Sequence, residues 1–213
     1  MRGKIVLLGA GGHCKVIIEL IRAIGTYEIA GILAQESAPK QVMGVPVIGD
    51  DDELPRVFAA GITKAFICIG NLSVRDRLFE KLQCFGFTLP VLIHPTAYIS
   101  PSAIVAEGTC VLAHAIVNTG ACIGQNCIIN TAAVVEHDCA LARNVHISPN
   151  AALAGGVKIG SNTHIGLGAA IIQKCQIGKG VTIGAGAVVI HNVPDFATAI
   201  GVPAKVISYK ECE

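Results

Sequence analysis

The sequence predicts a small α/β domain followed by a β-solenoid in one chain of 213 residues. Over about the first ninety residues, short aliphatic segments alternate with helix-compatible segments, which is typical of a parallel α/β sheet. After residue 94 the pattern changes, and an aliphatic residue returns at every sixth position. We therefore expect two domains, covering residues 1–93 and 94–213.

The first domain is predicted to have a Rossmann-like βαβαβ order, with a glycine turn at residues 9–12 after its first strand. Three strands are expected, at residues 4–8, 29–33 and 65–69. Helices are expected at residues 14–24, from near Leu54, and at residues 74–85. The first helix is predicted to carry its apolar side on Val16, Ile17, Leu20 and Ile24.

The second domain is defined by its repeat. From Ile99 to Val189, every sixth residue is Ile, Leu or Val, and a small residue stands four positions after most of these aliphatics. A period of six fits neither a helix nor one alternating strand, so the chain must coil in short segments joined by regular turns. Such hexapeptide repeats resemble the left-handed parallel β-helix, in which three repeats form one triangular coil of about 18 residues.

Composition limits the function classes. With 16 Lys and Arg against 15 Asp and Glu, the chain has no general attraction for nucleic acid or an anionic membrane. No apolar run approaches the roughly 18 residues of a membrane span, and no signal-peptide pattern is present, so we expect a cytoplasmic protein without membrane insertion. The nine cysteines lack a CxxC pair and are expected as thiols. Cys127, Cys139 and Cys175 occupy the small repeat position, where packing explains them.

The histidines point to chemistry. His146 and His164 are separated by one full coil of the repeat and are expected to stack on successive coils. His137 precedes His146 by half a coil, so these two side chains are expected to meet only between subunits. His137 also stands between Glu136 and Asp138, and neighbouring carboxylates stabilise an imidazolium and favour proton abstraction.

Six segments carry a specific resemblance: GAGGHCKV, FICIGN, LIHPTAYISPSAIV, INTAAVVEHDC, HISPNAALAGGVKIG and GVPAKVI. In this order and spacing they resemble the hexapeptide acyltransferase family that includes bacterial nucleotide-sugar N-acetyltransferases of bacillosamine synthesis and sialic acid O-acetyltransferases. The resemblance implies a homotrimer that moves an acetyl group from acetyl-CoA to a sugar amine or hydroxyl, most simply that of a nucleotide-linked amino sugar. It implies no metal.

The resemblance also implies roles for single residues. His137 matches the general base, and Asp138 matches the carboxylate that assists it. The matching acetyl-CoA contacts are Asn130, His146, Gly155, Leu167 and Ala185. A backbone N–H near Gly155 is expected to donate to the oxyanion of the reaction. The matching acceptor contacts are Gly11, Gly12, His13, Gly70 and Asn71.

The glycine turn differs from a dinucleotide site. Cys14 stands where GxGxxG has its third glycine, and no acidic residue ends the second predicted strand, which disfavours NAD. Uridine-recognising members of the resembling family carry an acidic pair there, whereas this chain has Ala34 and Gln35. A different nucleotide, different uracil contacts and a free sugar such as sialic acid all stay open, as do N- and O-acetylation.

Two other classes compete with acyl transfer. A β-helical carbonic anhydrase binds zinc through three histidines from neighbouring chains, and His114, His137, His146 and His164 supply enough imidazoles, although their spacing does not match that family. A noncatalytic trimeric scaffold would keep the aliphatic repeat but would have no need of Glu136-His137-Asp138.

Overall fold

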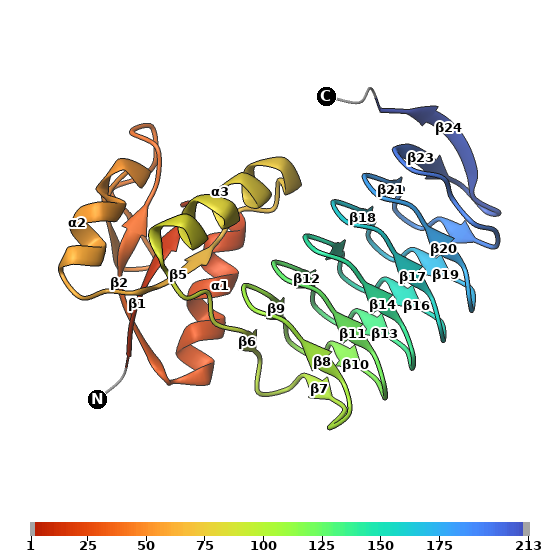
Figure 1. Cartoon of the computed structure of the whole chain (residues 1–213), viewed down its shortest axis with the longest axis horizontal. Helices are drawn as coiled ribbons and strands as arrows, with labels where there is room; N and C mark the ends of the chain where they lie inside the picture. Colours follow the sequence, from red (N-terminus) through yellow and green to blue (C-terminus); the bar gives the residue numbers. More distant parts are fainter. Residues whose placement is uncertain (1–2, 211–213) are drawn as a thin grey trace. The chain divides into compact units, whose positions relative to one another are not determined.

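The chain folds into two compact units, Met1–Leu92 and Ile93–Glu213, in a computed structural model that describes residues 3–210 (Figure 1). The first unit is a sheet with helices, and the second is a parallel β-helix of hexapeptide repeats. Both fold predictions are confirmed. Within the described residues, no helix combines the length and apolar character that a membrane crossing needs.

The first unit contains a sheet in the order β3-β4-β2-β1-β5. Its strands are β1 (Gly3–Leu8), β2 (Tyr27–Leu33), β3 (Gln41–Val42), β4 (Val45–Gly49) and β5 (Lys64–Ile67). The central pairings are parallel, as expected, whereas β3 pairs antiparallel to β4. This hairpin was absent from the sequence prediction because Gly44 and Pro46 make the segment read as a loop.

The helices of this unit are α1 (Gly12–Ile24), α2 (Leu54–Ala59) and α3 (Leu72–Phe85), with a 3₁₀ turn η1 (Asp51–Glu53) before α2. The apolar face predicted for α1 is partly wrong, because Val16 is 40% exposed. Its buried face consists of Cys14, Ile17, Ile18, Leu20 and Ile21. The stripe begins at the small residue Cys14 and follows the i, i+3, i+4, i+7 pattern from there.

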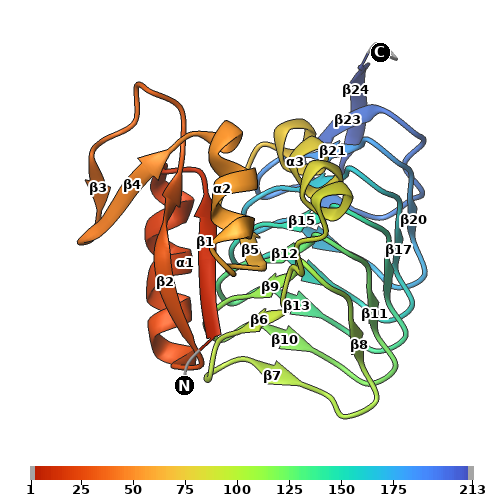
Figure 2. The same ribbon diagram turned by 60° about the vertical axis from the view of Figure 1, so that its left-hand side comes forward.

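The second unit has three sheets, one on each side of the coil (Figure 2). The eight-stranded sheet contains β6 (Leu92–Ile93), β9 (Cys110–Val111), β12 (Ile128–Ile129), β15 (His146–Ile147), β18 (His164–Ile165), β21 (Thr182–Ile183), β23 (Ala197–Ile200) and β24 (Lys205–Tyr209). The six-stranded sheet contains β7 (Tyr98–Ile99), β10 (Ile116–Val117), β13 (Val134–Val135), β16 (Ala152–Leu153), β19 (Ala170–Ile171) and β22 (Val188–Val189). The third side contains β8 (Ile104–Val105), β11 (Cys122–Ile123), β14 (Ala140–Leu141), β17 (Lys158–Ile159) and β20 (Gln176–Ile177).

The aliphatic repeat forms the core of this β-helix. Its members are buried from Val111 to Val189, whereas Ile99 and Val105 in the first coil are only partly buried. The small position is buried from Thr109 to Ala187, and it includes Cys127, Cys139 and Cys175 as predicted. Burial raises the pKa of the Cys139 and Cys175 thiols, which suits packing rather than nucleophilic chemistry.

The corners follow the same period. Every sixth residue from Gly108 to Gly186 has a positive φ, and most of these residues are Gly, Asn or Asp. Such residues adopt the left-handed conformation most easily, so each one allows the chain to turn from one sheet to the next. The repeat therefore consists of a two-residue strand and a turn, and it determines which side chains lie at each corner.

Candidate active site

The site residues predicted for the second unit lie at two corners of the β-helix, on opposite edges of the six-stranded sheet. The corner after β13 holds His137 and Asp138, and the corresponding corner one coil later holds Gly155. The corners on the other edge join the eight-stranded to the six-stranded sheet. These corners hold or adjoin Asn130, His146, Leu167 and Ala185. One chain therefore does not bring the two groups together.

His137 and Asp138 form a directed pair. Nδ1 of His137 lies 2.8 Å from Oδ2 of Asp138, which accepts the Nδ1 proton, so Nε2 is the nitrogen left to act as a base. Asp138 has a φ of 59°, in the left-handed region that aspartate tolerates. In the single chain the two side chains are 61% and 75% exposed. The pair is thus oriented and accessible.

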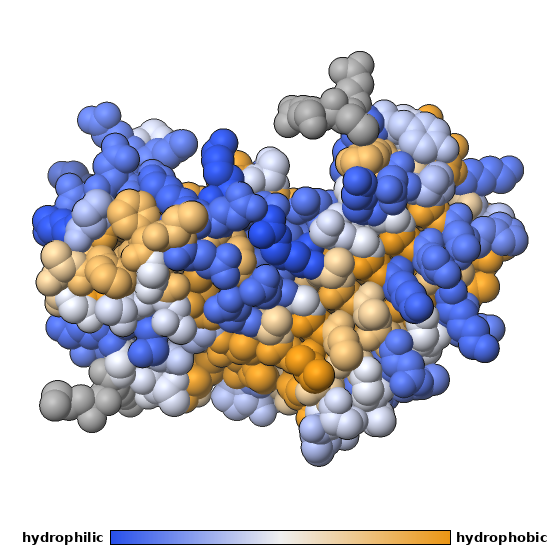
Figure 3. All heavy atoms as spheres, viewed as in Figure 1, coloured by the Kyte–Doolittle hydropathy of each residue, from blue (hydrophilic) through white to orange (hydrophobic). Residues whose placement is uncertain are grey.

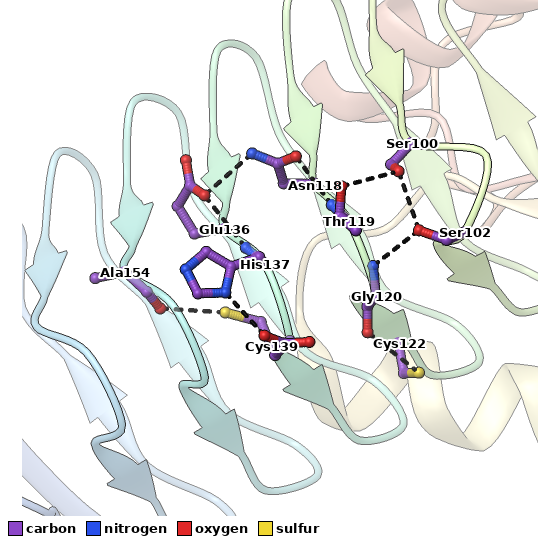
Figure 4. A network of polar contacts seen from close by, with 11 residues as sticks. Ser100, Ser102, Asn118, Thr119, Gly120, Cys122, Glu136, His137, Cys139 and Ala154 are labelled. Carbon is purple, nitrogen blue, oxygen red and sulfur yellow. Dashed lines mark hydrogen bonds and ion pairs between the residues drawn. The ribbon is translucent and has the colours of Figure 1, made fainter.

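Glu136 has a different role from the one its position suggested. Its Oε2 accepts hydrogen bonds from Asn118 Nδ2 at 3.0 Å and from the backbone N–H of His137 at 3.2 Å (Figure 4). The expectation that carboxylates flank the imidazole on both sides is therefore wrong, because the main chain and Asn118 engage the Glu136 carboxylate. Glu136 supports the backbone of the base, and Asp138 contacts its ring.

Gly155 takes the place of His137 on the next coil. A Cβ at Gly155 would overlap the His137 ring around Nε2, so the imidazole lies directly against the glycine backbone. The N–H of His137 donates to the Glu136 carboxylate. At the equivalent position one coil later, Ala154 has no carboxylate that could accept the N–H of Gly155. Among the described residues, none accepts a hydrogen bond from the Gly155 N–H. An open donor therefore lies beside the base.

At the other corner, hydrogen bonds define the state of His146. The backbone N–H of Thr131 donates to Asn130 Oδ1 at 2.8 Å, which assigns the amide nitrogen of Asn130 to its other contact. That nitrogen lies 3.1 Å from His146 Nε2, so Nε2 accepts and the proton of the neutral ring is on Nδ1. Asn130 thereby holds His146 as an Nδ1–H tautomer.

His146 and His164 stack as predicted. They are register partners in β15 and β18, with ring centroids 5.0 Å apart. Leu167 is 53% exposed at the corner after β18, and exposed Ala185 takes the same place one coil later. These two side chains line the edge of the coil on the C-terminal side of His146.

The first unit contains a cavity of about 700 Å³ at the ends of β1, β2 and β5. Four predicted acceptor contacts, Gly11, Gly12, His13 and Gly70, line it together with Ala34 and Gln35. Asn71 is absent from the lining, and its Oδ1 accepts from the N–H of Val74 as the cap of α3. Sequence analysis missed the polar lining residues Ser37, Asp51, Arg77 and Lys81, because scattered charges in loops and helices carry no motif.

Two titratable side chains that line this cavity, Asp51 and His13, have lowered pKa values. Lys81 Nζ binds Asp51 Oδ2 at 2.6 Å, and this hydrogen bond lowers the pKa of the Asp51 carboxyl. Burial, followed by the charge of Arg75, lowers the pKa of His13 to about 4, so its ring is neutral near pH 7. Nε2 of His13 is buried, and no described residue hydrogen-bonds to it. It is a polar atom that a bound molecule can satisfy.

A second hollow of about 810 Å³ lies along β11, β14, β17 and β20 on the third side of the β-helix. It is lined by strand and corner residues such as Cys122, Lys158 and Asp195, and it contains none of the predicted site residues. We therefore do not assign the reaction to it. Within residues 3–210 of one chain, no three His, Cys, Asp or Glu side chains gather as a metal site would require.

A hexapeptide β-helix with an oriented His–Asp pair beside an open N–H defines the class of hexapeptide acyltransferases. Two family models match, the PglD N-terminal domain at residues 4–82 and the bacterial transferase hexapeptide repeat at residues 156–191. The chain is similar to PerB of Caulobacter crescentus in complex with CoA and GDP-perosamine, with 43% identity, a TM-score of 0.93, and 98% and 99% of the two chains covered.

Two further relatives agree. The acetyltransferase domain of PglB from Neisseria gonorrhoeae, in complex with acetyl coenzyme A, is 42% identical with a TM-score of 0.90, over 97% of this chain and 100% of that one. The UDP-N-acetylbacillosamine N-acetyltransferase of Bacillus subtilis is 40% identical over 115 residues, 52% of this chain and 51% of that protein. The match thus spans about half the length of that curated relative. The chain belongs to the family of hexapeptide-repeat nucleotide-sugar N-acetyltransferases.

Proposed function

We propose that this protein transfers the acetyl group of acetyl-CoA to the amine of a nucleotide-linked amino sugar, with His137 as general base. The observation that carries the proposal is the corner at which the imidazole, oriented by Asp138, lies against Gly155 with its open N–H. Amide formation from a thioester needs a base and an oxyanion donor next to each other. This corner offers both.

The step is a direct attack. The amine nitrogen bonds to the thioester carbonyl carbon while Nε2 of His137 takes the proton of the amine. The carbonyl oxygen becomes an oxyanion, to which the Gly155 N–H donates. The oxyanion collapses, the C–S bond breaks, and the CoA sulfur leaves with the proton from His137. Because the thioester is already activated, no covalent enzyme intermediate is needed.

The nucleotide part of the acceptor is assigned to the cavity of the first unit. Gly11 is the N-cap of α1, and its neighbours present backbone N–H groups of the kind that bind phosphate at a helix start. The buried Nε2 of His13 supplies a further polar contact. The uncharged pair Ala34 and Gln35 and the likeness to an enzyme seen with GDP-perosamine favour a GDP-linked over a UDP-linked acceptor.

Acetyl-CoA is assigned to the edge that carries His146, Leu167 and Ala185, with Asn130 holding His146 in place. Residues 156–210 contain five lysines and one acidic residue, whereas residues 93–155 contain one arginine and three acidic residues. The later coils also show more hydrophilic surface on the face drawn in Figure 3. The lysines of the later coils attract the negatively charged phosphates of CoA, so the acetyl end is assigned to the earlier coils.

The complete site is assigned to a homotrimer. His137 and His146 lie on opposite edges of the six-stranded sheet, so a second chain has to supply one of them. Tyr98 in β7 is exposed, whereas from β10 to β22 the outward residues of that sheet are small or aliphatic and half-buried: Ile116, Val134, Ala152, Ala170 and Val188. Such a face suits contact with a neighbouring chain, and a closed ring of three would repeat the shared site three times.

The test is a screen of acceptors with acetyl-CoA, following the release of free thiol. GDP-perosamine, a UDP-linked 4-amino sugar and sialic acid are compared at equal concentrations. Turnover with an amino sugar linked to a nucleotide, and mass spectra that show an N-linked acetyl group, support the proposal. Turnover with sialic acid alone would replace it with O-acetylation, and no acetyl transfer to any of the three would refute it.

A further inference from the structure

The corner that holds His146 contains a second hydrogen-bonded histidine pair, Ser148–His164, which is built in the same way as Asn130–His146. His146 Nε2 bonds to Asn130, which precedes it by 16 residues, and His164 Nε2 bonds to Ser148, which again precedes it by 16 residues. The two rings face each other with their centroids 5.0 Å apart and their planes inclined by 30°. The Ser148–His164 distance is 2.7 Å. One coil therefore repeats the arrangement of the coil before it.

The Ser148–His164 pair is held in place and is uncharged. Ser148 is 5% exposed, so its hydroxyl has few alternatives to the imidazole. Burial, with a smaller contribution from the charge of Lys210, lowers the pKa of His164, which keeps this ring neutral near pH 7. A neutral ring held by a short hydrogen bond is a flat surface on which the ring of His146 can rest. It adds no charge that would repel a proton on His146.

The coil itself does not require these two side chains. At the strand position of His164, the next coil carries Thr182. Two coils earlier, beyond His146, the same position carries Ile128. At the corner position of Ser148, the next two coils carry Gly166 and Gly184. The fold thus accepts a small, aliphatic or absent side chain at these positions. A reason other than coil formation is needed for the Ser–His pair.

We propose that Ser148 and His164 are positioning residues that hold the ring of His146 in one plane and one tautomer, so that the ring keeps a constant position at the acetyl end of acetyl-CoA. The inference rests on the proposed function in that it takes His146 to contact the acetyl group. Asn130 fixes one edge of the His146 ring, and His164 supports one face. Two such constraints leave the ring little freedom to rotate.

The experiment compares His164→Ala, His164→Phe and Ser148→Ala with the wild type. Nitrogen-15 spectra of the His146 side chain are recorded without substrate, and kcat, KM and the calorimetric Kd for CoA are then measured. Gln176→Ala is the matched control, because Gln176 also points outward from a two-residue strand but lies on another side of the coil. Thermal unfolding of every variant shows whether the fold is retained.

We expect His146 in the wild type to give the nitrogen shifts of a single Nδ1–H tautomer, and His164→Ala and Ser148→Ala to give averaged shifts. His164→Ala should lower kcat by about tenfold to a hundredfold, since small displacements of a reacting group have effects of this size. The Kd for CoA should change by less than about threefold, because CoA lacks the acetyl group. His164→Phe keeps a ring under His146 and should recover much of the lost rate.

Unchanged His146 nitrogen shifts in His164→Ala would overturn the positioning role, and so would unchanged turnover in that variant. A loss in Gln176→Ala as large as that in His164→Ala would also overturn it. The spectra need no substrate, so they decide the position of the ring even if wild-type protein fails to transfer acetyl groups. Failure of the proposed function and failure of this inference therefore give different results.

Discussion

The imidazole of His137 lies directly against the backbone of Gly155, the residue that takes its place one coil later. In a β-helix, positions one full coil apart stack, so the side chain at one coil limits what the next coil can carry. Only a residue without Cβ lets the ring of the base rest at this height. The same residue presents an N–H with no acceptor among the described residues. Base and oxyanion donor are thus coupled by stacking.

His137→Ala removes the base, and we expect kcat to fall by about 10²- to 10⁴-fold. The Kd for CoA should stay within about threefold, because the corner column of His146 is untouched. Steady-state kinetics and calorimetry with the same preparation measure both quantities. Asp138→Asn keeps the shape of the corner but removes the charge that orients the ring, so its loss should be smaller. Turnover close to wild type in His137→Ala would exclude His137 as the base.

Gly155→Ala should lower kcat by about tenfold to a hundredfold, because the new Cβ displaces the His137 ring. The φ of Gly155 is outside the left-handed region, so the backbone accepts alanine and thermal stability should change little. The control is a double-mutant cycle with His137→Ala. Once the ring is gone, adding Gly155→Ala should cost little more. Equal losses in both backgrounds would show that the glycine acts independently of the base.

Mixing two inactive variants tests the shared site. His137→Ala and His146→Ala homotrimers should both have greatly reduced activity. After unfolding and refolding together in equal amounts, chains should combine at random, and each mixed trimer should contain one intact site. Activity should therefore return to about one quarter of the wild-type value. A mixture as inactive as its components, with mixed trimers demonstrated by mass spectrometry, would contradict a site formed by two chains.

His13 should make stability depend on pH. Burial and then the charge of Arg75 lower its pKa from 6.5 to about 4, so between these values the unfolded chain binds more protons than the folded one. Stability is fully present above about pH 6.5, and up to about 3 kcal/mol is lost as the pH falls toward 4. Urea unfolding of wild type and His13→Gln across this range measures the difference. His191→Gln, which changes an exposed histidine, should retain the wild-type slope.

Asn144→Ala should destabilise the β-helix by about 2–4 kcal/mol. Asn144 is fully buried with a φ of 59°, it accepts from Asn126 Nδ2 at 3.1 Å, and it donates to Asn162 Oδ1 at 2.6 Å. Urea unfolding at one protein concentration measures the change. Asn150→Ala is the control, because Asn150 has a similar φ but an exposed side chain. If both variants lose equal stability, the backbone conformation and not the hydrogen-bonded ladder explains the loss.

Sequence patterns located much of the fold and named residues that the structure gathers at two corners. The stacking of His146 on His164 followed from their spacing of one coil together with the resemblance to a three-sided β-helix, in which every third repeat is in register. The sequence also contained a signal that was missed, namely a Gly, Asn or Asp at most corner positions. The β3–β4 hairpin and part of the buried face of α1 were missed, because partner strands and packing decide them.

The six-residue aliphatic period was enough to predict the class of fold, because it allows only one set of residues to face inward, whereas the kind of chemistry was implied by the resemblance to hexapeptide acyltransferases. The sequence did not determine which groups the side chains at the corners would bind. The folded coils show that the Glu136 carboxylate bonds to the main chain, whereas Asp138 contacts the ring of His137. The half-coil spacing of His137 and His146 already indicated that one chain holds them apart, and the structure places the two groups of site residues on opposite edges of one sheet. Hydrogen-bond partners depend on geometry between coils, which no local pattern in the sequence contains.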